Sequence, residues 1–281
     1  MLNVDFLRLK KMETPKISII TVGMNHLNYL KDLLPSVYNN ITPPPISQNV
    51  ADWVEMIYVD NCSTDDSIEF IRQNYPQVTI IQNQEALGFG ENNNKGVLAA
   101  HGEYIAVINP DIIIKADALC QMLTFAQNHP EVGIIVPQLL NPDGSLQRSV
   151  RRYIDVKSLV SRGMTKGKDS ANNEKVNRYL CKDLDCSKTQ EVDWAIGAAL
   201  FMKRELYAEL GGFDTDYFLY MEDEDICLRS WKLRRPVVYL PTAQMIHNHL
   251  RASSKIGKKM FIHMKSMMTF FRKHGLSPKR F

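Results

Sequence analysis

The chain has 281 residues, of which 44% are hydrophobic and 23% are charged, as in an ordinary folded protein. No apolar stretch approaches the roughly 20 residues that a membrane-spanning helix needs, and charged residues interrupt the N-terminus where a secretory signal would be apolar. The five cysteines are scattered without zinc-site spacing, which favours reduced thiols. We therefore expect a cytoplasmic protein, either one large domain or a domain with an appendage.

Short apolar runs alternate with helical patterns through the first half of the chain. The predicted strands are residues 17–22, 56–60, 78–81, 104–108 and 133–136. The predicted helices begin near Leu27, after Ser63 as N-cap with Asp65 and Asp66 in the first turn, and over residues 88–100 and 117–127. Successive prolines force a loop over residues 42–46, and residues 141–144 form a tight turn. Strands that alternate with helices predict a parallel α/β sheet with right-handed crossovers.

The alternation weakens in the second half of the chain. Residues 155–190 are polar, and their composition favours a mobile loop over a folded insertion. Order returns at Trp194, with helices predicted near residues 204–210 and 223–233. Strands are predicted over residues 237–240 and 244–247.

The net charge of +3 conceals a basic C-terminal segment. Residues 251–281 contain nine Lys or Arg and no Asp or Glu. An apolar stripe runs along this segment at helical spacing and consists of Met260, Met264, Met267, Met268 and Phe271. A basic amphipathic helix of this kind suits binding to an anionic membrane surface, and it equally suits packing on the protein with its charges in water. Both interpretations are open.

Carboxylates stand where the chemistry of a transferase needs them. Asp60 and Asp111 each end an apolar run, and the carboxyl ends of parallel strands open onto a ligand crevice. Two carboxylates at that edge suit a nucleotide and the divalent metal on its diphosphate. The acidic cluster at residues 222–225 offers a base that activates an acceptor hydroxyl. Together these features favour a sugar-transferring enzyme.

Several short motifs follow one another along the chain. They are Thr21-Val22 with Asn25, Val59-Asp60-Asn61, Gly88-Phe89 with Asn93-Asn94, Asn109-Pro110-Asp111, Trp194 with Gly197-Ala198, Gly211-Gly212-Phe213-Asp214, Tyr220-Met221-Glu222-Asp223, and Pro241 with His247. In this order they resemble the family 2 glycosyltransferases of the GT-A fold, in the branch that includes bacterial rhamnosyltransferases and other cell-surface polysaccharide enzymes. The resemblance covers roughly residues 17 to 254.

The resemblance implies a fold and a division of the chain. The fold is α/β of the GT-A type, with a Rossmann-like, mostly parallel central sheet flanked by helices and a C-terminal basic amphipathic helix. Residues 1–16 would be an extension and residues 17–254 the catalytic domain. Within that domain, residues 17–136 would bind the nucleotide and residues 137–254 the acceptor, and residues 255–281 would form the basic tail.

The resemblance also implies a nucleotide and metal site. Asp60 would accept the imide N–H of uracil or thymine, although a turn aspartate is the alternative. Asp111 and His247 would hold Mg²⁺ or Mn²⁺, although a lone histidine is more often structural. The implied nucleotide-binding residues are Thr21, Asn25, Asp60, Asn61, Asn94, Asn109 and Asp111, and helix capping is an alternative for Asn94.

On the acceptor side the resemblance implies that Asp223 is the general base, because inverting transfer needs one carboxylate to take the acceptor proton. Glu222 would hold the acceptor or orient the loop, and Gly197 would lie beside it. Trp194 is either a stacking platform for a sugar or a core residue. Arg152 is either a contact for an acceptor phosphate or a solvated surface residue.

The predicted function is therefore an inverting glycosyltransferase. It would move a sugar from a UDP- or dTDP-sugar to a glycan or lipid-linked acceptor in cell-surface polysaccharide synthesis, without a nucleic-acid partner. Its expected location is the cytoplasm, with a peripheral position on the inner face of the plasma membrane as an open alternative. A sugar nucleotidyltransferase is the alternative among enzymes, and a non-catalytic sugar-binding or membrane-adaptor protein the alternative from another class.

Overall fold

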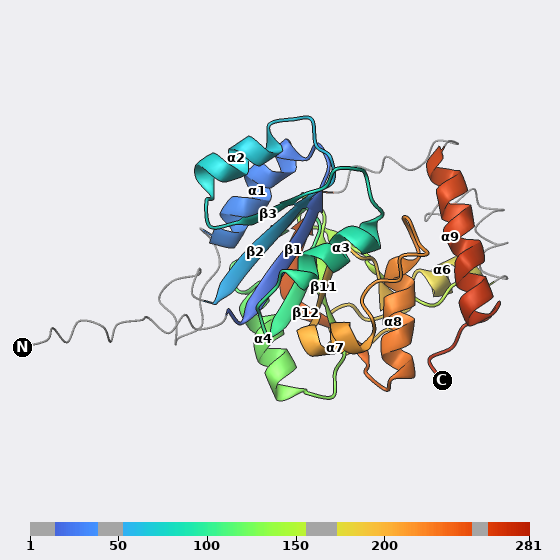
Figure 1. The fold of residues 1–281 in the computed structure, drawn as a ribbon. Helices are drawn as coiled ribbons and strands as arrows, with labels where there is room; N and C mark the ends of the chain where they lie inside the picture. The colour runs from blue at the N-terminus through green and yellow to red at the C-terminus, as the bar shows by residue number, and fades with distance from the viewer. Residues whose placement is uncertain (1–14, 39–52, 156–172, 249–257) are drawn as a thin grey trace, which may run out of the picture.

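The computed structural model describes residues 15–38, 53–155, 173–248 and 258–281 (Figure 1). Most of the predicted N-terminal extension and the proline loop at residues 42–46 lie outside these ranges, as do residues 156–172 of the predicted mobile loop. Within the described ranges, no helix is long and apolar enough to cross a bilayer.

One large sheet organises the chain. Four parallel strands lie side by side in the order β3 (Thr79–Gln82), β2 (Val54–Asp60), β1 (Ile17–Gly23) and β4 (Tyr104–Ile108). The antiparallel strand β11 (Ala199–Lys203) joins β4 to β6 (Ile134–Leu140), which pairs in parallel with β12 (Val237–His247). The antiparallel edge strand β5 (Ile112–Ile114) completes the order. The predicted α/β fold with a mostly parallel central sheet is confirmed.

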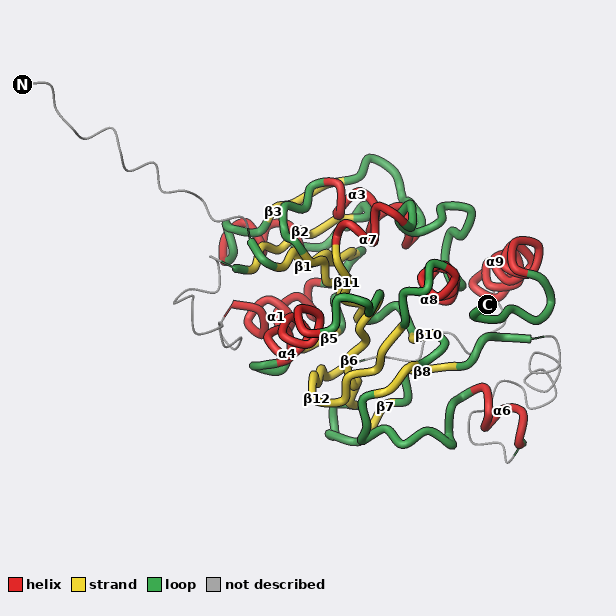
Figure 2. The backbone as a smooth tube through the Cα atoms, turned by 90° about the horizontal axis from the view of Figure 1, so that it is seen from below, coloured by secondary structure: helices red, strands yellow, loops and turns green. Residues whose placement is uncertain are grey.

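Helices cover both faces of this sheet because its strands bury side chains on both sides. Leu30, Leu33 and Leu34 of α1 (Leu27–Tyr38) pack with α4 (Ala118–Asn128) in one core cluster. The other cluster lies under α8 (Glu222–Lys232) and includes Ile226 and Trp231, with α3 (Phe89–Leu98) and α7 (Arg204–Glu209) on the same side of the sheet (Figure 2). The alternation of Ile19 and Ile20 between the two clusters shows how one strand supplies both.

The C-terminal helix α9 (Lys258–His274) packs against α8 (Figure 1). Phe270 is fully buried, and the hydroxyl of Ser266 donates to the carbonyl of Leu219 at 2.8 Å. His274 Nε2 lies 2.7 Å from Asp225 Oδ1 in the interior. Arg280, beyond the helix, stacks over the ring of Trp231 at 3.9 Å. The packing interpretation of the tail is thus confirmed.

The outer side of α9 nevertheless remains apolar. Phe261 and Met268 are 68% and 63% exposed, and Met260 and Met264 are 40% and 46% exposed. The predicted stripe is therefore divided, because Met267 and Phe271 pack against the core while the other three methionines face outward.

Three local predictions were wrong. Helix α2 begins at Ser67 rather than after Ser63 (it spans Ser67–Asn74), because Asp60 Oδ2 accepts the N–H of Ser63 and holds this segment in a turn. Strand β12 is continuous where two strands were predicted. Its register shifts between Leu240 and Gln244, next to Pro241, which has no N–H to pair. The described part of residues 155–190 contains α6 (Glu174–Tyr179), which is capped by the side chain of Asn173.

The short strands were not predicted. Pairs of residues form β7 (Leu146–Gln147), β8 (Val150–Arg151), β9 (Gln190–Glu191) and β10 (Trp194–Ala195), and β5 has only three residues. Elements this short are set by pairing with distant segments and leave no periodic pattern in the sequence.

Candidate active site

The carboxyl ends of the parallel strands form one polar edge. Gly23 at the end of β1 lies opposite Asp60 at the end of β2, and residues 109–111 follow β4 on the other side of β1. Gly23 is required here because a Cβ at this position would lie 2.2 Å from the hydroxyl of Tyr58. The sheet therefore brings Asp60 and Asp111 to the same edge, as the sequence predicted.

Asp60 is a buried carboxylate in which only one oxygen is hydrogen-bonded among the described residues. It is 2% exposed, and its Oδ2 accepts the N–H of Ser63 at 3.1 Å. Among the described residues, Oδ1 has no hydrogen-bond partner, and the same holds for the buried hydroxyl of Thr21. An unsatisfied buried polar group costs about 1–3 kcal/mol, so these two atoms mark a place where a ligand would supply the partner.

Two asparagines that were predicted to bind the nucleotide, Asn25 and Asn61, are bonded within the protein itself. Asn25 Oδ1 accepts the N–H groups of Thr64 and Asp65 at 2.7 and 3.2 Å. Asn61 bonds to both backbone groups of Leu87, at 2.8 and 3.0 Å. Their side chains build the loops around Asp60, and a nucleotide contact remains a prediction.

Asn94, which was also predicted to bind the nucleotide, bonds to the backbone of Phe213. Its side chain donates to the carbonyl of Phe213 at 2.8 Å and accepts the N–H of Phe213 at 2.9 Å. It also accepts the hydroxyl of Tyr207. Asn94 therefore ties α3 to the segment that follows α7, which is a different structural role from the predicted capping alternative.

Asp111 and His247 meet as predicted. His247 is the last residue of β12 and pairs with Ile112, so Asp111 Oδ2 lies 3.4 Å from His247 Nε2. The other ring nitrogen, Nδ1, lies 2.5 Å from Gln147 Oε1. An amide oxygen only accepts, so Nδ1 carries a hydrogen and donates it to Gln147, which would leave Nε2 for a cation.

This arrangement fits a divalent cation. Two ligand atoms about 2.1 Å from one cation lie up to about 4.2 Å apart, and the observed 3.4 Å is within that reach. Ligand histidines typically donate their other N–H to a fixed acceptor, as His247 does to Gln147. No group of three His, Cys, Asp or Glu side chains assembles in the described part of the chain. A cation here would take its remaining ligands from a diphosphate and water, which is how Mg²⁺ is commonly held.

The acidic cluster forms the first turn of α8. Tyr220 and Met221, just before the helix, both have left-handed backbones, with φ of 70° and 73°. Such strain costs about 1–3 kcal/mol per residue and occurs where the surrounding structure fixes a functional segment. Asp223 Oδ2 accepts the N–H of Gly197 at 2.9 Å, and Oδ1 accepts the N–H of Glu224 at 2.9 Å.

Two neighbouring carboxylates in this turn have raised pKa values. Burial, and then the charge of Asp223, raises the pKa of Glu222 well above its usual range. Burial also raises the pKa of Asp223, while the N–H groups of Gly197 and Glu224 and the charge of Arg151 act in the opposite direction. Among the described residues Glu222 Oε2 has no hydrogen-bond partner. Of the two, Asp223 is therefore the one that ionises first.

One short segment links the two ends of the site. The N–H of Asn109 donates to the carbonyl of Ala198 at 2.9 Å, and the N–H of the preceding Gly197 donates to Asp223. A Cβ on Gly197 would lie 3.2 Å from the Cβ of Asp223, so glycine allows this close approach. Gly197 and Ala198 thus connect the segment after β4, which carries Asp111, to the helix that carries Asp223.

The other two predicted acceptor residues, Trp194 and Arg152, are engaged by other parts of the protein. Trp194 is 7% exposed, and its indole N–H donates to the carbonyl of Arg152 at 2.8 Å. This burial favours the core alternative over sugar stacking. Arg152 pairs with Asp183 at 2.7 Å and lines a separate pocket, which is described below.

Two residues near the site were missed. Gln147 lies in the Asp-Gly-Ser-x-Gln stretch, but nothing in that pattern shows that it orients His247 from 100 positions away. His26 follows β1. Burial lowers the pKa of His26, while the charges of Asp111 and Asp65 oppose that shift, so its ring lies near the candidate cation site.

Comparison with known proteins identifies the family. Residues 18–211 match the family described as Glycosyl transferase family 2. The chain belongs to this family. It is 29% identical over 248 residues to the N-acetylglucosaminyl-diphospho-decaprenol L-rhamnosyltransferase of Mycobacterium tuberculosis, covering 80% of this chain and 79% of that protein. It is 28% identical over 275 residues to Rhamnosyltransferase WbbL of Escherichia coli K12, covering 94% and 96%. The predicted resemblance and the assignment as a glycosyltransferase are confirmed.

Solved structures confirm the GT-A fold. GalNAc-T7 with UDP, GalNAc and Mn²⁺ superposes with a TM-score of 0.67 at 14% identity, covering 92% of this chain and 48% of that one. The mannosyltransferase PcManGT of Pyrobaculum calidifontis, in complex with GDP-Man and Mn²⁺, gives a TM-score of 0.58 at 19% identity, covering 85% and 59%. The chain thus spans about half the length of these structures, and the likeness concerns the fold alone.

The raised pKa of Asp223 predicts an acid limb in the pH profile of this glycosyltransferase. If Asp223 must be ionised, kcat/KM falls as pH drops through its raised pKa. Arg151→Gln removes a positive charge that lowers the pKa of Asp223, so the acid limb should move to higher pH. Glu222→Gln is the control, because glutamine resembles the protonated Glu222 that is present when Asp223 titrates, and it should leave the limb in place. The profile of kcat/KM against pH measures the position of the limb in both variants. A limb that does not move in Arg151→Gln would contradict the assignment.

Proposed function

We propose that the chain is an inverting glycosyltransferase that moves a sugar from a UDP- or dTDP-sugar to a glycan or lipid-linked acceptor in cell-surface polysaccharide synthesis. The observation that carries this proposal is the bond from Gly197 to Asp223, next to the bond from Asn109 to Ala198. Through these bonds a carboxylate on one helix is fixed relative to the strand end that carries Asp111. A donor at the sheet edge and an acceptor at α8 would then meet between them.

Asp223 is the proposed general base. Inverting transfer needs one carboxylate that takes the acceptor proton as its oxygen attacks the anomeric carbon. Two backbone N–H bonds orient Asp223 and favour its ionised form. Glu222 would hold its own proton beside it and donate a hydrogen bond to the acceptor, because burial raises its pKa. The two carboxyl groups then differ in protonation, as acid and base partners in active sites commonly do.

Asp60, Asp111 and His247 form the proposed donor side. The unpartnered Oδ1 of Asp60 suits the imide N–H of uracil or thymine, and Thr21 would bond nearby. Asp111 and His247 would hold Mg²⁺ or Mn²⁺, which when bound offsets the charge of the departing diphosphate. The Mn²⁺ in the two solved structures of this fold supports a divalent cation without deciding which one.

The relatives favour one acceptor class. One is an L-rhamnosyltransferase whose name specifies a diphospho-decaprenol acceptor, and another is a rhamnosyltransferase. We therefore favour a lipid-linked acceptor and a rhamnosyl donor for this chain. The family assignment counts against the nucleotidyltransferase alternative, and the geometry of Asp223 counts against a non-catalytic adaptor. The division into nucleotide-binding residues 17–136 and acceptor-binding residues 137–254 belongs to the same proposal.

The outer side of α9 would rest on an anionic leaflet. Met260, Phe261, Met264 and Met268 are exposed there, and Lys265 and Arg272 are exposed on the same helix. Apolar side chains rimmed by cations suit the interface of a membrane that contains anionic lipid. A peripheral position of this kind would bring the site to a lipid-linked acceptor.

Asp223→Asn should reduce transfer by at least about 100-fold, the lower end of general-base effects. The protein should stay folded with a small loss of stability, because the amide oxygen of Asn can keep one of the two backbone N–H bonds but its NH2 group cannot accept the other. Nucleotide affinity should change little, because Asp223 would act on the acceptor side. Initial rates and thermal unfolding measure the two effects. The matched control is Glu224→Gln in the same turn, because burial raises the pKa of Glu224 and its neutral form resembles glutamine. Near wild-type turnover of Asp223→Asn would remove Asp223 as the base.

Alanine variants of Asp60 and Asp111 should distinguish binding of the nucleotide base from binding of the metal. Asp111→Ala should weaken Mn²⁺-dependent binding of the nucleoside diphosphate far more than binding of the nucleoside, and Asp60→Ala should weaken both by about ten-fold or more. Titration calorimetry with uridine, thymidine and their diphosphates, with and without Mn²⁺, measures this. Asp65→Ala is the control, since Asp65 also accepts backbone N–H groups in this loop, from Leu27 at 3.1 Å and Ser67 at 3.2 Å. Equal losses in all three variants would mean that these aspartates only hold the fold.

The membrane proposal predicts a loss of vesicle binding when the outer side of α9 becomes polar. The triple variant Phe261→Ser, Met264→Ser and Met268→Ser should bind anionic vesicles less and melt at the wild-type temperature, because these side chains are exposed. Co-sedimentation with vesicles in low and high salt measures the loss. The control replaces Leu98 and Leu233, which are exposed on other helices, by serine. If the wild-type protein does not co-sediment with anionic vesicles, the membrane proposal is wrong.

A further inference from the structure

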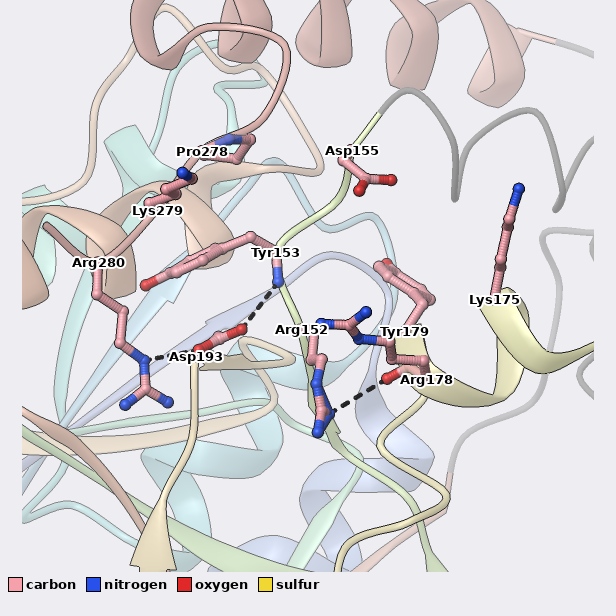
Figure 3. A pocket seen from close by; sticks show the side chains of 10 residues that line it. All are labelled: Arg152, Tyr153, Asp155, Lys175, Arg178, Tyr179, Asp193, Pro278, Lys279 and Arg280. Carbon is pink, nitrogen blue, oxygen red and sulfur yellow. Dashed lines mark hydrogen bonds and ion pairs between the residues drawn. The ribbon is translucent and has the colours of Figure 1, made fainter.

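A basic pocket lies between the C-terminal segment, α6 and the strand β8 (Figure 3). Its volume of ≈390 Å³ is within the range of small-ligand sites. The side chains of Arg152, Lys175, Arg178, Lys279 and Arg280 line it, together with the carboxylates of Asp155 and Asp193. None of these residues belongs to the donor site, so the pocket is a second place where anions would gather.

Two of the five cations are fixed by the protein. Arg280 bonds to Asp193 at 2.7 Å and stacks over Trp231, and Arg152 pairs with Asp183. The charge of Asp193 is therefore already compensated inside the pocket. The close-up shows Arg280 reaching Asp193 from the C-terminal side, with α6 on the opposite side of the pocket (Figure 3).

Three cations remain available. Lys175, Arg178 and Lys279 are exposed, and in the described part of the chain no ion pair or side-chain hydrogen bond engages them. They come from α6 and from the C-terminal segment, which are far apart in sequence and converge here. Arg and Lys side chains that line one pocket suit the oxygens of a phosphate or diphosphate.

The pocket is connected to the proposed base. The N–H of Tyr153, a lining residue, donates to Asp193 at 3.3 Å. The N–H of the next residue, Ile154, donates to Glu224 at 2.8 Å, and Glu224 follows Asp223 directly. On the other side, Asp193 and Gly197 are four residues apart in the sequence, so their Cα atoms lie at most roughly 14 Å apart. A single hexose that carries a diphosphate bridges a distance of this order.

We propose that this pocket binds the diphosphate of a lipid-linked sugar acceptor and thereby places the sugar hydroxyl at Asp223. The inference rests on the proposed function, because it names the acceptor class of that same site. The lipid would leave the pocket along α9, whose C-terminal continuation supplies Lys279 and Arg280 and whose outer side carries the exposed Met and Phe side chains.

Binding of farnesyl diphosphate to the full-length protein tests the pocket without requiring transfer. In buffer without divalent cations, titration calorimetry should show a Kd that is about 10- to 100-fold higher for Lys175→Ala with Arg178→Ala than for wild type. The control, Lys31→Ala with Arg72→Ala, removes the same charge from exposed positions on α1 and α2 and should bind as wild type does. Thermal unfolding of each variant shows whether it is folded, and Lys279→Ala offers a second variant outside α6. Unchanged affinity in the folded pocket variants would overturn the inference.

Inorganic pyrophosphate separates the two sources of a diphosphate. It should bind the wild type more weakly than farnesyl diphosphate does, because it lacks the lipid chain. If it binds equally well, the pocket recognises free phosphate and the lipid-linked acceptor is the wrong ligand.

Transfer kinetics then connect the pocket to the reaction. The pocket variant should raise KM for a lipid-diphosphate sugar by about 10- to 100-fold, and it should leave kcat/KM unchanged for the alkyl glycoside of the same sugar. An equal loss of kcat/KM for both acceptors would mean that the pocket does not bind the diphosphate. If the wild type transfers to neither acceptor, the proposed function fails, while the calorimetry still decides what the pocket binds.

Discussion

Four consecutive carboxylates in the first turn of α8 are the constraint on which the proposed acceptor side depends. Glu222, Glu224 and Asp225 are 5%, 1% and 1% exposed, and Asp223 is only partly exposed. Burying that many acids in one turn is unfavourable unless each finds a donor, a cation or a proton. The helix N-terminus favours negative charge there, but the dipole alone contributes only about 0.3–1 kcal/mol per charge.

The structure meets this constraint with a different partner for each carboxylate. Asp225 is bonded to Arg229 at 2.7 Å and to His274, and Glu224 accepts the N–H of Ile154. Asp223 accepts two N–H groups, whereas Glu222 keeps a raised pKa and an oxygen without a partner among the described residues. Asp225 is thus compensated by Arg229, whereas Glu224 resembles Glu222 in having a raised pKa and one oxygen without a partner among the described residues. The C-terminal helix supports the candidate active site, since His274 and Ser266 bond to the turn that carries Asp223 and to the segment just before it.

The sequence predicted that Asp60 and Asp111 lie at one edge of the sheet, but it did not predict the contacts of the polar side chains around them. Asp60 and Asp111 could be found because a buried parallel strand has a local signature, and a residue directly after it lies at the sheet edge. The roles of Asn61 and Asn94 could not, because their partners, Leu87 and Phe213, are reached only through the tertiary fold. The same holds for Gln147, which orients His247 across the sheet. Local patterns specify where a chain turns, but they do not specify which polar side chains the folded protein uses for its own loops.

The basic C-terminal segment also shows that a sequence pattern does not reveal which side chains pair within the folded protein. The sequence has nine cations after residue 250, and from the sequence alone each would contribute on the order of 1 kcal/mol to binding an anionic membrane. In the structure, Lys273 pairs with Asp214 and with Asp216 at 2.7 Å, and Arg280 pairs with Asp193 at 2.7 Å. Cations that are already bonded within the fold contribute less to attraction over a distance, because the paired carboxylates cancel much of their field. Membrane contact would then depend more on the exposed Met and Phe side chains than on net charge. Acidic residues of the domain thus pair with cations of the tail, and a cation without such a partner among the described residues, such as Lys279 in the pocket, would be free to meet a ligand.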